Sequence, residues 1–214
     1  MDTGEGYLAR ALATRVARVD ALDERTVALA RARAFNNCPK VNYIERRAQE
    51  FTPIDQYNLV ISLEAFHLIG DQESLLRRLV SVLATGGSLC VAWVEFFWEE
   101  FLFENFAAAF SRFGVEWGPA ANLAIIDLER LTAAALPEFG LEYGSSYVNV
   151  AQRISLPQIV NYMSSISKAE ALSGLGKAFL RRAMLQRFRQ AGVPEEISGG
   201  SRYVIEFVRI NACA

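Results

Sequence analysis

The sequence predicts an α/β protein in which helices cover both faces of a doubly wound, mostly parallel sheet. Two nearly continuous apolar runs, YNLVISL at 57–63 and SLCVAW at 88–93, have the composition of central strands. Between them, the segment at 71–82 places its leucines and valines on one stripe at helical spacing. The order strand, helix, strand is typical of parallel strands joined by right-handed crossovers.

Shorter elements precede this central unit. We expect a helix at 7–14, and then a short strand at 15–19 that ends at Asp20. Asp23 has the side chain of an N-cap, and it would begin a helix through Ala34. The next predicted strand is VNYIE at 41–45.

The pattern changes after Trp93, where residues 95–113 are rich in both phenylalanine and glutamate. We expect one domain over residues 1–214, with helical, aromatic cap segments at about 94–122 and 152–176. The remaining predicted elements are a helix capped by Asp127, a strand at 141–151, a helix capped by Ser155, a helix at 177–191 and a strand at 202–210.

Composition excludes several classes of function. The net charge is −2 and the isoelectric point is near 5.6, whereas a dedicated nucleic-acid surface normally needs a basic excess. The most apolar stretch, 88–110, is interrupted by four glutamates, which argues against a membrane span. We therefore expect a small-molecule substrate, with no nucleic-acid or membrane partner.

The cysteine and histidine content predicts no metal site. The three cysteines lie far apart and the chain holds one histidine, His67, so no short-spaced ligand set is present. The opening residues lack the apolar core of a secretion signal. A reducing, cytoplasmic location is the expected one.

Three segments, taken in order, resemble the class I S-adenosylmethionine-dependent methyltransferases. Residues 3–34 are similar to that family's glycine-rich loop, its helix and the second strand with its terminal acid. Residues 57–93 are similar to its fourth strand, the following helix, the "L-x-x-G-G" turn and the fifth strand. The last helix and strand fit its closing antiparallel strand. The resemblance implies a Rossmann-like methyltransferase sheet and S-adenosylmethionine as cofactor.

The resemblance also implies a set of cofactor-binding residues. Glycines let the backbone approach a ligand carboxylate closely, and an acid at a strand end can accept both ribose hydroxyls. An alternative is that the glycines form an ordinary turn and Asp20 lies in an exposed loop. The implied residues are Gly4 and Gly6 for the methionine carboxylate, Asp20 and Ala21 for the ribose, Ala48 and Gln49 for adenine, and Ser62 and Leu63 for the methionine moiety.

His67 is the candidate catalytic residue. It follows the fourth strand of the resemblance, where relatives often place a pocket residue, and its ordinary pKa suits a general base. The alternative is a packing histidine between Phe66 and Leu68. Glu64 and Glu95 are weaker catalytic candidates.

The aromatic segment suggests the substrate. Phe96, Phe97 and Trp98 are candidates to line a pocket for an apolar or aromatic metabolite, and Trp117 is a candidate for a lid over it. Such a substrate points to secondary metabolism. A dimer interface or a helical cover explains the same residues, so a homodimer is also expected.

The chain departs from the family pattern at several positions. Asp2 stands where the first glycine usually lies, Arg47 replaces a common acid, and Asn58 replaces a common aspartate. The family's first strand is missing from the sequence, through truncation, closure of the sheet around the gap, or donation of a strand by a partner. Two functions follow: a small-molecule methyltransferase, or a degenerate relative that serves as a binding subunit or cyclase.

Overall fold

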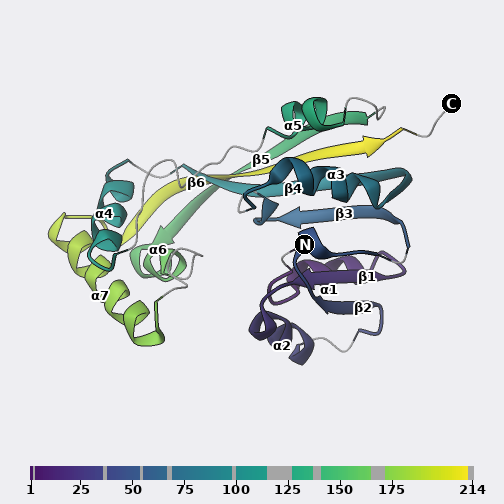
Figure 1. The fold of residues 1–214 in the computed structure, drawn as a ribbon. Coiled ribbons are helices and arrows are strands. Elements are labelled where there is room, and N and C mark those ends of the chain that lie inside the picture. The colour runs from purple at the N-terminus through teal and green to yellow at the C-terminus, as the bar shows by residue number, and fades with distance from the viewer. Residues whose placement is uncertain are drawn as a thin grey trace. The chain divides into compact units, whose positions relative to one another are not determined.

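The computed structural model describes residues 1, 3–35, 38–53, 55–66, 69–97, 100–114, 127–136, 141–164 and 172–211. Helices and strands alternate along the chain, which confirms the predicted α/β class (Figure 1). The elements are α1 (Tyr7–Ala13), β1 (Val19–Asp23), α2 (Thr26–Ala34), β2 (Val41–Glu45), the 3₁₀ turn η1 (Ala48–Glu50), β3 (Tyr57–Leu63), α3 (Gln72–Ser81), β4 (Leu83–Phe97), α4 (Glu100–Ser111), α5 (Leu128–Ala135), β5 (Leu141–Ser155), α6 (Leu156–Met163), α7 (Gly174–Gln190) and β6 (Glu196–Ile210).

The chain divides into two compact units. The first comprises Met1–Trp93, Ile125–Tyr147 and Val204–Ala214, and the second comprises Val94–Ala124 and Val148–Tyr203. The cap segments predicted at 94–122 and 152–176 both belong to the second unit, which also includes α7. The organisation as one domain with caps stays a prediction.

The strands form two sheets in the described residues. β1 and β2 pair in parallel, from Val19 opposite Val41 to Asp23 opposite Glu45. A second sheet has the order β3-β4-β6-β5, in which β3 and β4 are parallel and β6 runs against both (Figure 1). The mostly parallel sheet with an antiparallel carboxy-terminal strand is therefore confirmed.

No strand lies between β1 and β3 in the part of the chain that the structure describes. Backbone groups bridge this space instead, because the Met1 amino group donates to the Ile61 carbonyl at 2.7 Å and the Thr3 N–H donates to the Leu22 carbonyl at 2.8 Å. The first residues of the chain thus join the two sheets next to the glycine loop.

Helix α3 covers the larger sheet and confirms the predicted apolar stripe. Asp71 caps it by accepting the Ser74 N–H at 3.0 Å. The stripe packs with residues of β4, α5 and β6 into the core of the first unit. That core includes Leu75, Leu76, Leu79, Val80, Leu83, Leu89, Val91, Leu128 and Val208.

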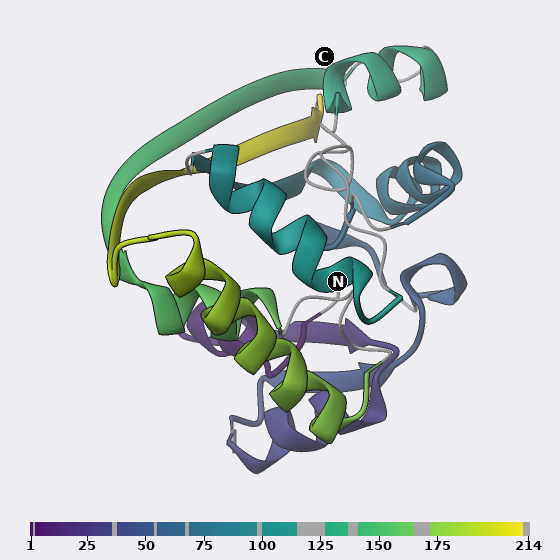
Figure 2. The same ribbon diagram turned by 90° about the vertical axis from the view of Figure 1, so that its left-hand side faces the viewer.

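Helices α4, α6 and α7 build the second unit around its own core. In Figure 2, α4 and α7 lie side by side, and the ring of Phe106 meets that of Phe188 edge-on at 4.9 Å. Phe106 and Phe110 are both fully buried here. These two rings of the aromatic segment therefore pack a helical core.

None of the helices in the described residues is long and apolar enough to cross a membrane.

Candidate functional site

The acid at the carboxyl end of β1 is Asp23. The sequence predicted a strand at 15–19 with Asp20 at its end and Asp23 as a helix cap, and both assignments are wrong. The strand runs from Val19 to Asp23, and α2 begins at Thr26 without a side-chain cap. The acid at this strand end was missed because its side chain also suits a helix cap.

Asp20 instead lies near the start of β1, in a polar cluster. Its carboxylate accepts hydrogen bonds from Tyr57 Oη at 2.6 Å, Arg18 Nη2 at 2.7 Å and Asn42 Nδ2 at 3.0 Å. Its burial alone would raise the pKa, but these donors outweigh burial and hold the pKa of Asp20 below its ordinary value. The strand-end position on which its predicted ribose role rested belongs to Asp23. Ala21, the other predicted ribose contact, is buried within the strand.

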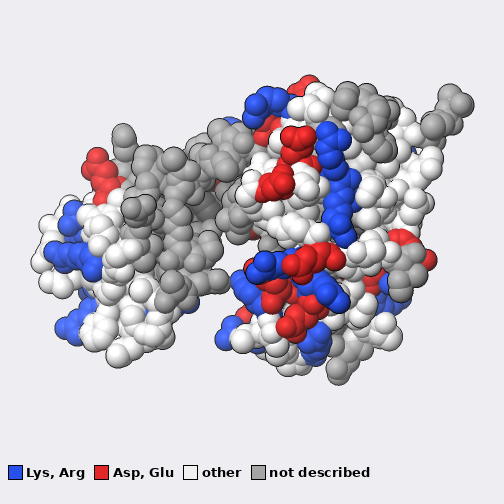
Figure 3. All heavy atoms as spheres, in the orientation of Figure 1, with Lys and Arg blue, Asp and Glu red and all other residues white. Residues whose placement is uncertain are grey.

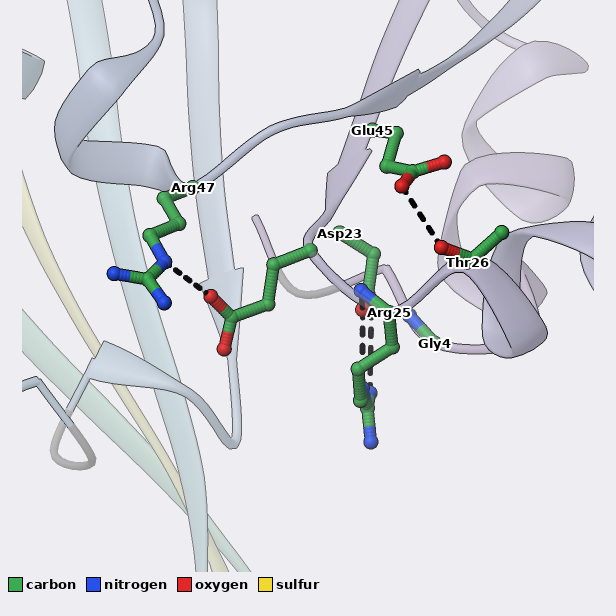
Figure 4. A network of polar contacts seen from close by, with 7 residues as sticks. Gly4, Asp23, Arg25, Thr26, Glu45 and Arg47 are labelled. Atoms are coloured by element: carbon green, nitrogen blue, oxygen red, sulfur yellow. Dashed lines mark hydrogen bonds and ion pairs between the residues drawn. The ribbon is translucent and has the colours of Figure 1, made fainter.

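The glycine loop reaches Asp23 directly. The Gly4 N–H donates to Asp23 Oδ2 at 2.7 Å across the strand end (Figure 4). Gly4 has φ +54° and Gly6 has φ +77°, both in the left-handed region that favours glycine. A Cβ atom on Gly4 would meet open space, whereas one on Gly6 would collide with the Tyr43 hydroxyl.

Arg25 holds the other side of the same carboxylate. Its backbone N–H donates to Asp23 Oδ1 at 2.9 Å, and its Nε donates to that oxygen at 3.0 Å. Burial alone would raise the pKa of Asp23, but the hydrogen bonds from Arg25 and Gly4 hold it below its ordinary value. Asp23 is thus a buried, ionised acid at the edge of the loop.

The carboxyl end of β2 carries a second group of charges beside Asp23. Arg47 donates to Glu24 at 2.7 Å, and Thr26 donates to Glu45 at 2.8 Å (Figure 4). The turn η1 follows, with Ala48 half-buried and Gln49 exposed. The predicted adenine residues therefore come directly after the strand that neighbours Asp23.

The carboxyl end of β3 combines an unpaired hydroxyl with a strained backbone. Ser62 is fully buried, and its Oγ has no hydrogen-bond partner in the described part of the chain. Leu63 is 41% exposed. Glu64 has φ +56°, an uncommon conformation outside glycine that is often found at functional sites. The sequence marked all three positions, but the strain at Glu64 has no signal in it.

The catalytic candidates are only partly described. His67 lies outside the described residues, as do Trp98 of the predicted pocket and Trp117 of the predicted lid, and the side chains of Phe96 and Phe97 are not described. Glu95 belongs to the second unit, where it lies 3.5 Å from Arg202. The catalytic role of His67 stays a prediction.

No metal centre is found among the residues with described positions, because no three or more of their histidine, cysteine, aspartate or glutamate side chains group together. On the face shown in Figure 3, acidic and basic side chains are interspersed over the first unit.

The comparisons with known proteins agree with this architecture. Residues 2–87 match the model of the methyltransferase domain family. This stretch contains the glycine loop, Asp23, η1 and the end of β3. This part of the chain is therefore similar to a methyltransferase domain.

Solved structures share the fold over nearly the whole chain. A methyltransferase of Bacillus halodurans, described as putative in its own structure report, aligns at 19% identity over 98% of this chain and 90% of its own, with a TM-score of 0.61. YcgJ of Bacillus subtilis aligns at 14% identity over 98% and 89%, with a TM-score of 0.60. The plantazolicin methyltransferase BpumL, solved with a pentazolic desmethylPZN analogue and S-adenosylhomocysteine, aligns at 16% identity over 98% and 74%, with a TM-score of 0.55. Among proteins with curated descriptions, none matches the sequence.

Proposed function

We propose that this chain binds S-adenosylmethionine and transfers its methyl group to a small apolar or aromatic metabolite. The observation that carries the proposal is the buried Asp23 carboxylate at the end of β1, held by the Gly4 N–H of the adjacent loop at 2.7 Å. An acid beside a glycine loop suits a ligand that presents a ribose diol. The family match of residues 2–87 and the S-adenosylhomocysteine bound to BpumL support the same cofactor.

The residues present fit such a cofactor. Asp23 would accept the ribose hydroxyls, in place of the Asp20 of the sequence prediction. The loop at Gly4 and Gly6 would lie against the methionine carboxylate, and the turn at Ala48 and Gln49 against adenine. The buried Ser62 hydroxyl lacks a partner in the described residues, and a polar atom of the methionine moiety beside Leu63 would supply one.

Methyl transfer requires mainly that the protein holds the two reactants in position. S-adenosylmethionine supplies an electrophilic methyl group, so the protein has to hold the acceptor in line with it and exclude water. A general base is needed only for an acceptor that must lose a proton, and we assign that role to His67. Replacing His67 with Ala should then lower methyl transfer and leave cofactor affinity unchanged.

The proposal of an apolar or aromatic acceptor rests on the phenylalanine-rich sequence of residues 95–113. BpumL, whose fold this chain shares, was solved with azole-containing analogues, which supports the same class of acceptor. Phe106 and Phe110 are excluded from a pocket because they are buried in the core of the second unit. The acceptor would therefore meet other residues of the segment.

One observation favours the alternative, a degenerate relative that does not transfer methyl groups. The two sheets of the first unit are separate in the described residues, and Met1 and Thr3 are the backbone links between them. A binding subunit does not have to hold an acceptor in line with the cofactor, whereas methyl transfer requires it.

Calorimetry with S-adenosylhomocysteine, combined with transfer of labelled methyl groups to a panel of aromatic acceptors, separates the two functions. Micromolar binding and transfer would support the methyltransferase. Binding without transfer to any acceptor would favour the degenerate relative. Absence of binding, both by this chain and by a version extended with an apolar first strand, would refute the cofactor proposal.

Cytoplasmic location, a role in secondary metabolism and homodimer formation stay predictions. For the dimer, β5 and β6 expose apolar side chains, among them Val148 at 58%, Tyr203 at 43% and Ile205 at 40%. Light scattering of the purified chain measures its oligomeric state.

A further inference from the structure

The Asp23 carboxylate has no acceptor position left. Oδ2 accepts the Gly4 N–H at 2.7 Å and Arg25 Nη2 at 3.2 Å. Oδ1 accepts the Arg25 backbone N–H at 2.9 Å and its Nε at 3.0 Å. An ionised carboxylate offers about four lone-pair positions on its two oxygens, so these four hydrogen bonds fill it.

The four bonds form two pairs of different character. The N–H groups of Gly4 and Arg25 belong to the backbone, and one reaches each carboxylate oxygen. The guanidinium also places one donor on each oxygen, in the fork geometry that arginine offers to carboxylates. A vicinal diol that binds the same carboxylate would donate to one acceptor position on each oxygen, which are the two positions that the guanidinium occupies.

Of the groups that bind the Asp23 carboxylate, the Arg25 guanidinium is the one that can move away from it. The Asp23 side chain is fully buried, whereas the Arg25 side chain that contacts it is 47% exposed (Figure 4). The guanidinium is half in water and regains solvation when it moves away, and an incoming diol replaces the two hydrogen bonds that the buried carboxylate would lose. The two backbone bonds need not change when it moves.

We infer that Arg25 is an internal substitute for the ribose diol and that it closes the cofactor site until a diol-bearing ligand displaces it. This inference rests on the proposed function, because it names the residue that controls entry to the same site. The apparent association constant of the site is then the intrinsic constant multiplied by the fraction of molecules in which Arg25 has left Asp23. A ligand without the diol gains nothing from that displacement.

Calorimetry with S-adenosylhomocysteine tests the inference on the whole chain, on Arg25→Met and on Arg77→Met. The Met side chain keeps the apolar stem and removes the guanidinium. Arg77 pairs with Glu73 on α3, so its replacement removes the same charge away from Asp23. We expect Arg25→Met to bind roughly threefold to tenfold more tightly than the unchanged chain, and Arg77→Met to bind equally.

The 2′,3′-dideoxy analogue of S-adenosylhomocysteine is the matched ligand. Its affinity should be the same in the unchanged chain and in Arg25→Met, because it does not compete with the guanidinium. An equal gain for both ligands would overturn the inference, as would weaker or unchanged binding of S-adenosylhomocysteine to a folded Arg25→Met.

A further variant covers the case in which Arg25→Met does not fold, as judged by circular dichroism. Arg25→Lys keeps the charge but offers a single ammonium in place of the fork, so it should also bind S-adenosylhomocysteine more tightly. Unchanged affinity in Arg25→Lys would then overturn the inference. If the unchanged chain, its variants and the version extended with an apolar first strand all fail to bind, the proposed function itself fails. If the unchanged chain binds and the arginine variants gain nothing, only the role of Arg25 fails.

Discussion

The Tyr57 hydroxyl donates to the Asp20 carboxylate at 2.6 Å and so joins β3 to β1 across the space where the two sheets do not pair. Met1 and Thr3 make the backbone links near the other end of the same space. The side-chain bond is short and charge-assisted, so it belongs to the stronger class of hydrogen bonds. It explains why an acid near the start of β1 is buried.

Tyr57→Phe should lower the free energy of unfolding by about 1–3 kcal/mol. The change removes a donor and leaves a buried carboxylate oxygen with fewer partners. Urea denaturation measures the loss. The control is Tyr7→Phe, because the Tyr7 side chain is 73% exposed and its ring is retained; we expect a change within about 0.5 kcal/mol. Equal stability of the Tyr57 variant and the unchanged chain would contradict the bridging role.

The stability of the chain should fall as the solution becomes acidic. The pKa of Asp20 is lowered in the folded state by its hydrogen bonds to Tyr57, Asn42 and Arg18, against the effect of burial. A group with a depressed folded pKa contributes stability above its unfolded pKa of about 3.9 and loses it as the pH falls through the folded value.

In Asp20→Asn, the decline of stability below about pH 4 should therefore be shallower than in the unchanged chain. Denaturation midpoints between pH 7 and pH 2.5 measure the slope. Glu73→Gln, which replaces an exposed carboxylate on α3 with the same isosteric change, is the matched control. Parallel curves for Asp20→Asn and the unchanged chain would disagree with the buried, ionised state of Asp20.

The two loop glycines should respond differently to alanine. Both have positive φ, so each substitution costs about 1 kcal/mol of backbone strain. A Cβ atom on Gly6 also meets the Tyr43 hydroxyl, whereas one on Gly4 meets open space. Gly6→Ala should therefore lower the melting temperature more than Gly4→Ala does.

Removal of the Tyr43 hydroxyl tests the steric part of this prediction. In a double-mutant cycle, Tyr43→Phe should recover part of the stability lost in Gly6→Ala and none of that lost in Gly4→Ala. Additive losses in both cycles would show that the hydroxyl does not set the cost at Gly6.

Ser62→Ala should separate binding from stability. The Ser62 hydroxyl is buried without a partner in the described residues, so its removal should leave the free energy of unfolding unchanged or raise it by about 1 kcal/mol. If the hydroxyl meets the methionine moiety, the same change should weaken S-adenosylhomocysteine binding several-fold. Thermal unfolding and calorimetry on one sample check both. A loss of stability with unchanged affinity would assign Ser62 to the fold alone.

Much of the fold was predictable, because it follows from apolar patterning and caps. Strands 41–45 and 57–63 lie where the sequence predicts them. The apolar run at 57–63 predicts a central strand covered on both faces, but β3 lies at the edge of its sheet in the described residues, and Leu59 and Leu63 are 42% and 41% exposed. Ser155 begins α6 as the sequence predicts, and in the structure it forms a capping box with Gln158. Asp127 begins α5 by accepting the Arg130 N–H at 2.8 Å. Local chemistry was sufficient in these cases.

The errors occur where a distant residue decides the structure. In the sequence, Asp20 resembles the end of a strand. In the structure it lies inside β1, where Tyr57 and Asn42 donate hydrogen bonds to its carboxylate. Both donors are distant in the sequence, so the residues around Asp20 do not predict them. The "L-x-x-G-G" turn that the resemblance implies, at Leu83–Gly87, is instead an irregularity within the longer strand β4, where Tyr57 pairs with Leu83 and Leu59 pairs with Ser88. The hydrogen bond between Asp23 and Gly4 and the strain at Glu64 likewise depend on the folded chain.

The most direct test compares Asp23→Asn with Asp20→Asn in calorimetric titrations with S-adenosylhomocysteine. The two substitutions are chemically identical and lie three residues apart on β1. If Asp23 holds the ribose, Asp23→Asn should weaken binding at least tenfold, whereas folded Asp20→Asn should bind within about twofold of the unchanged chain. Strong loss in Asp20→Asn with unchanged affinity in Asp23→Asn would contradict the assignment of the site to Asp23.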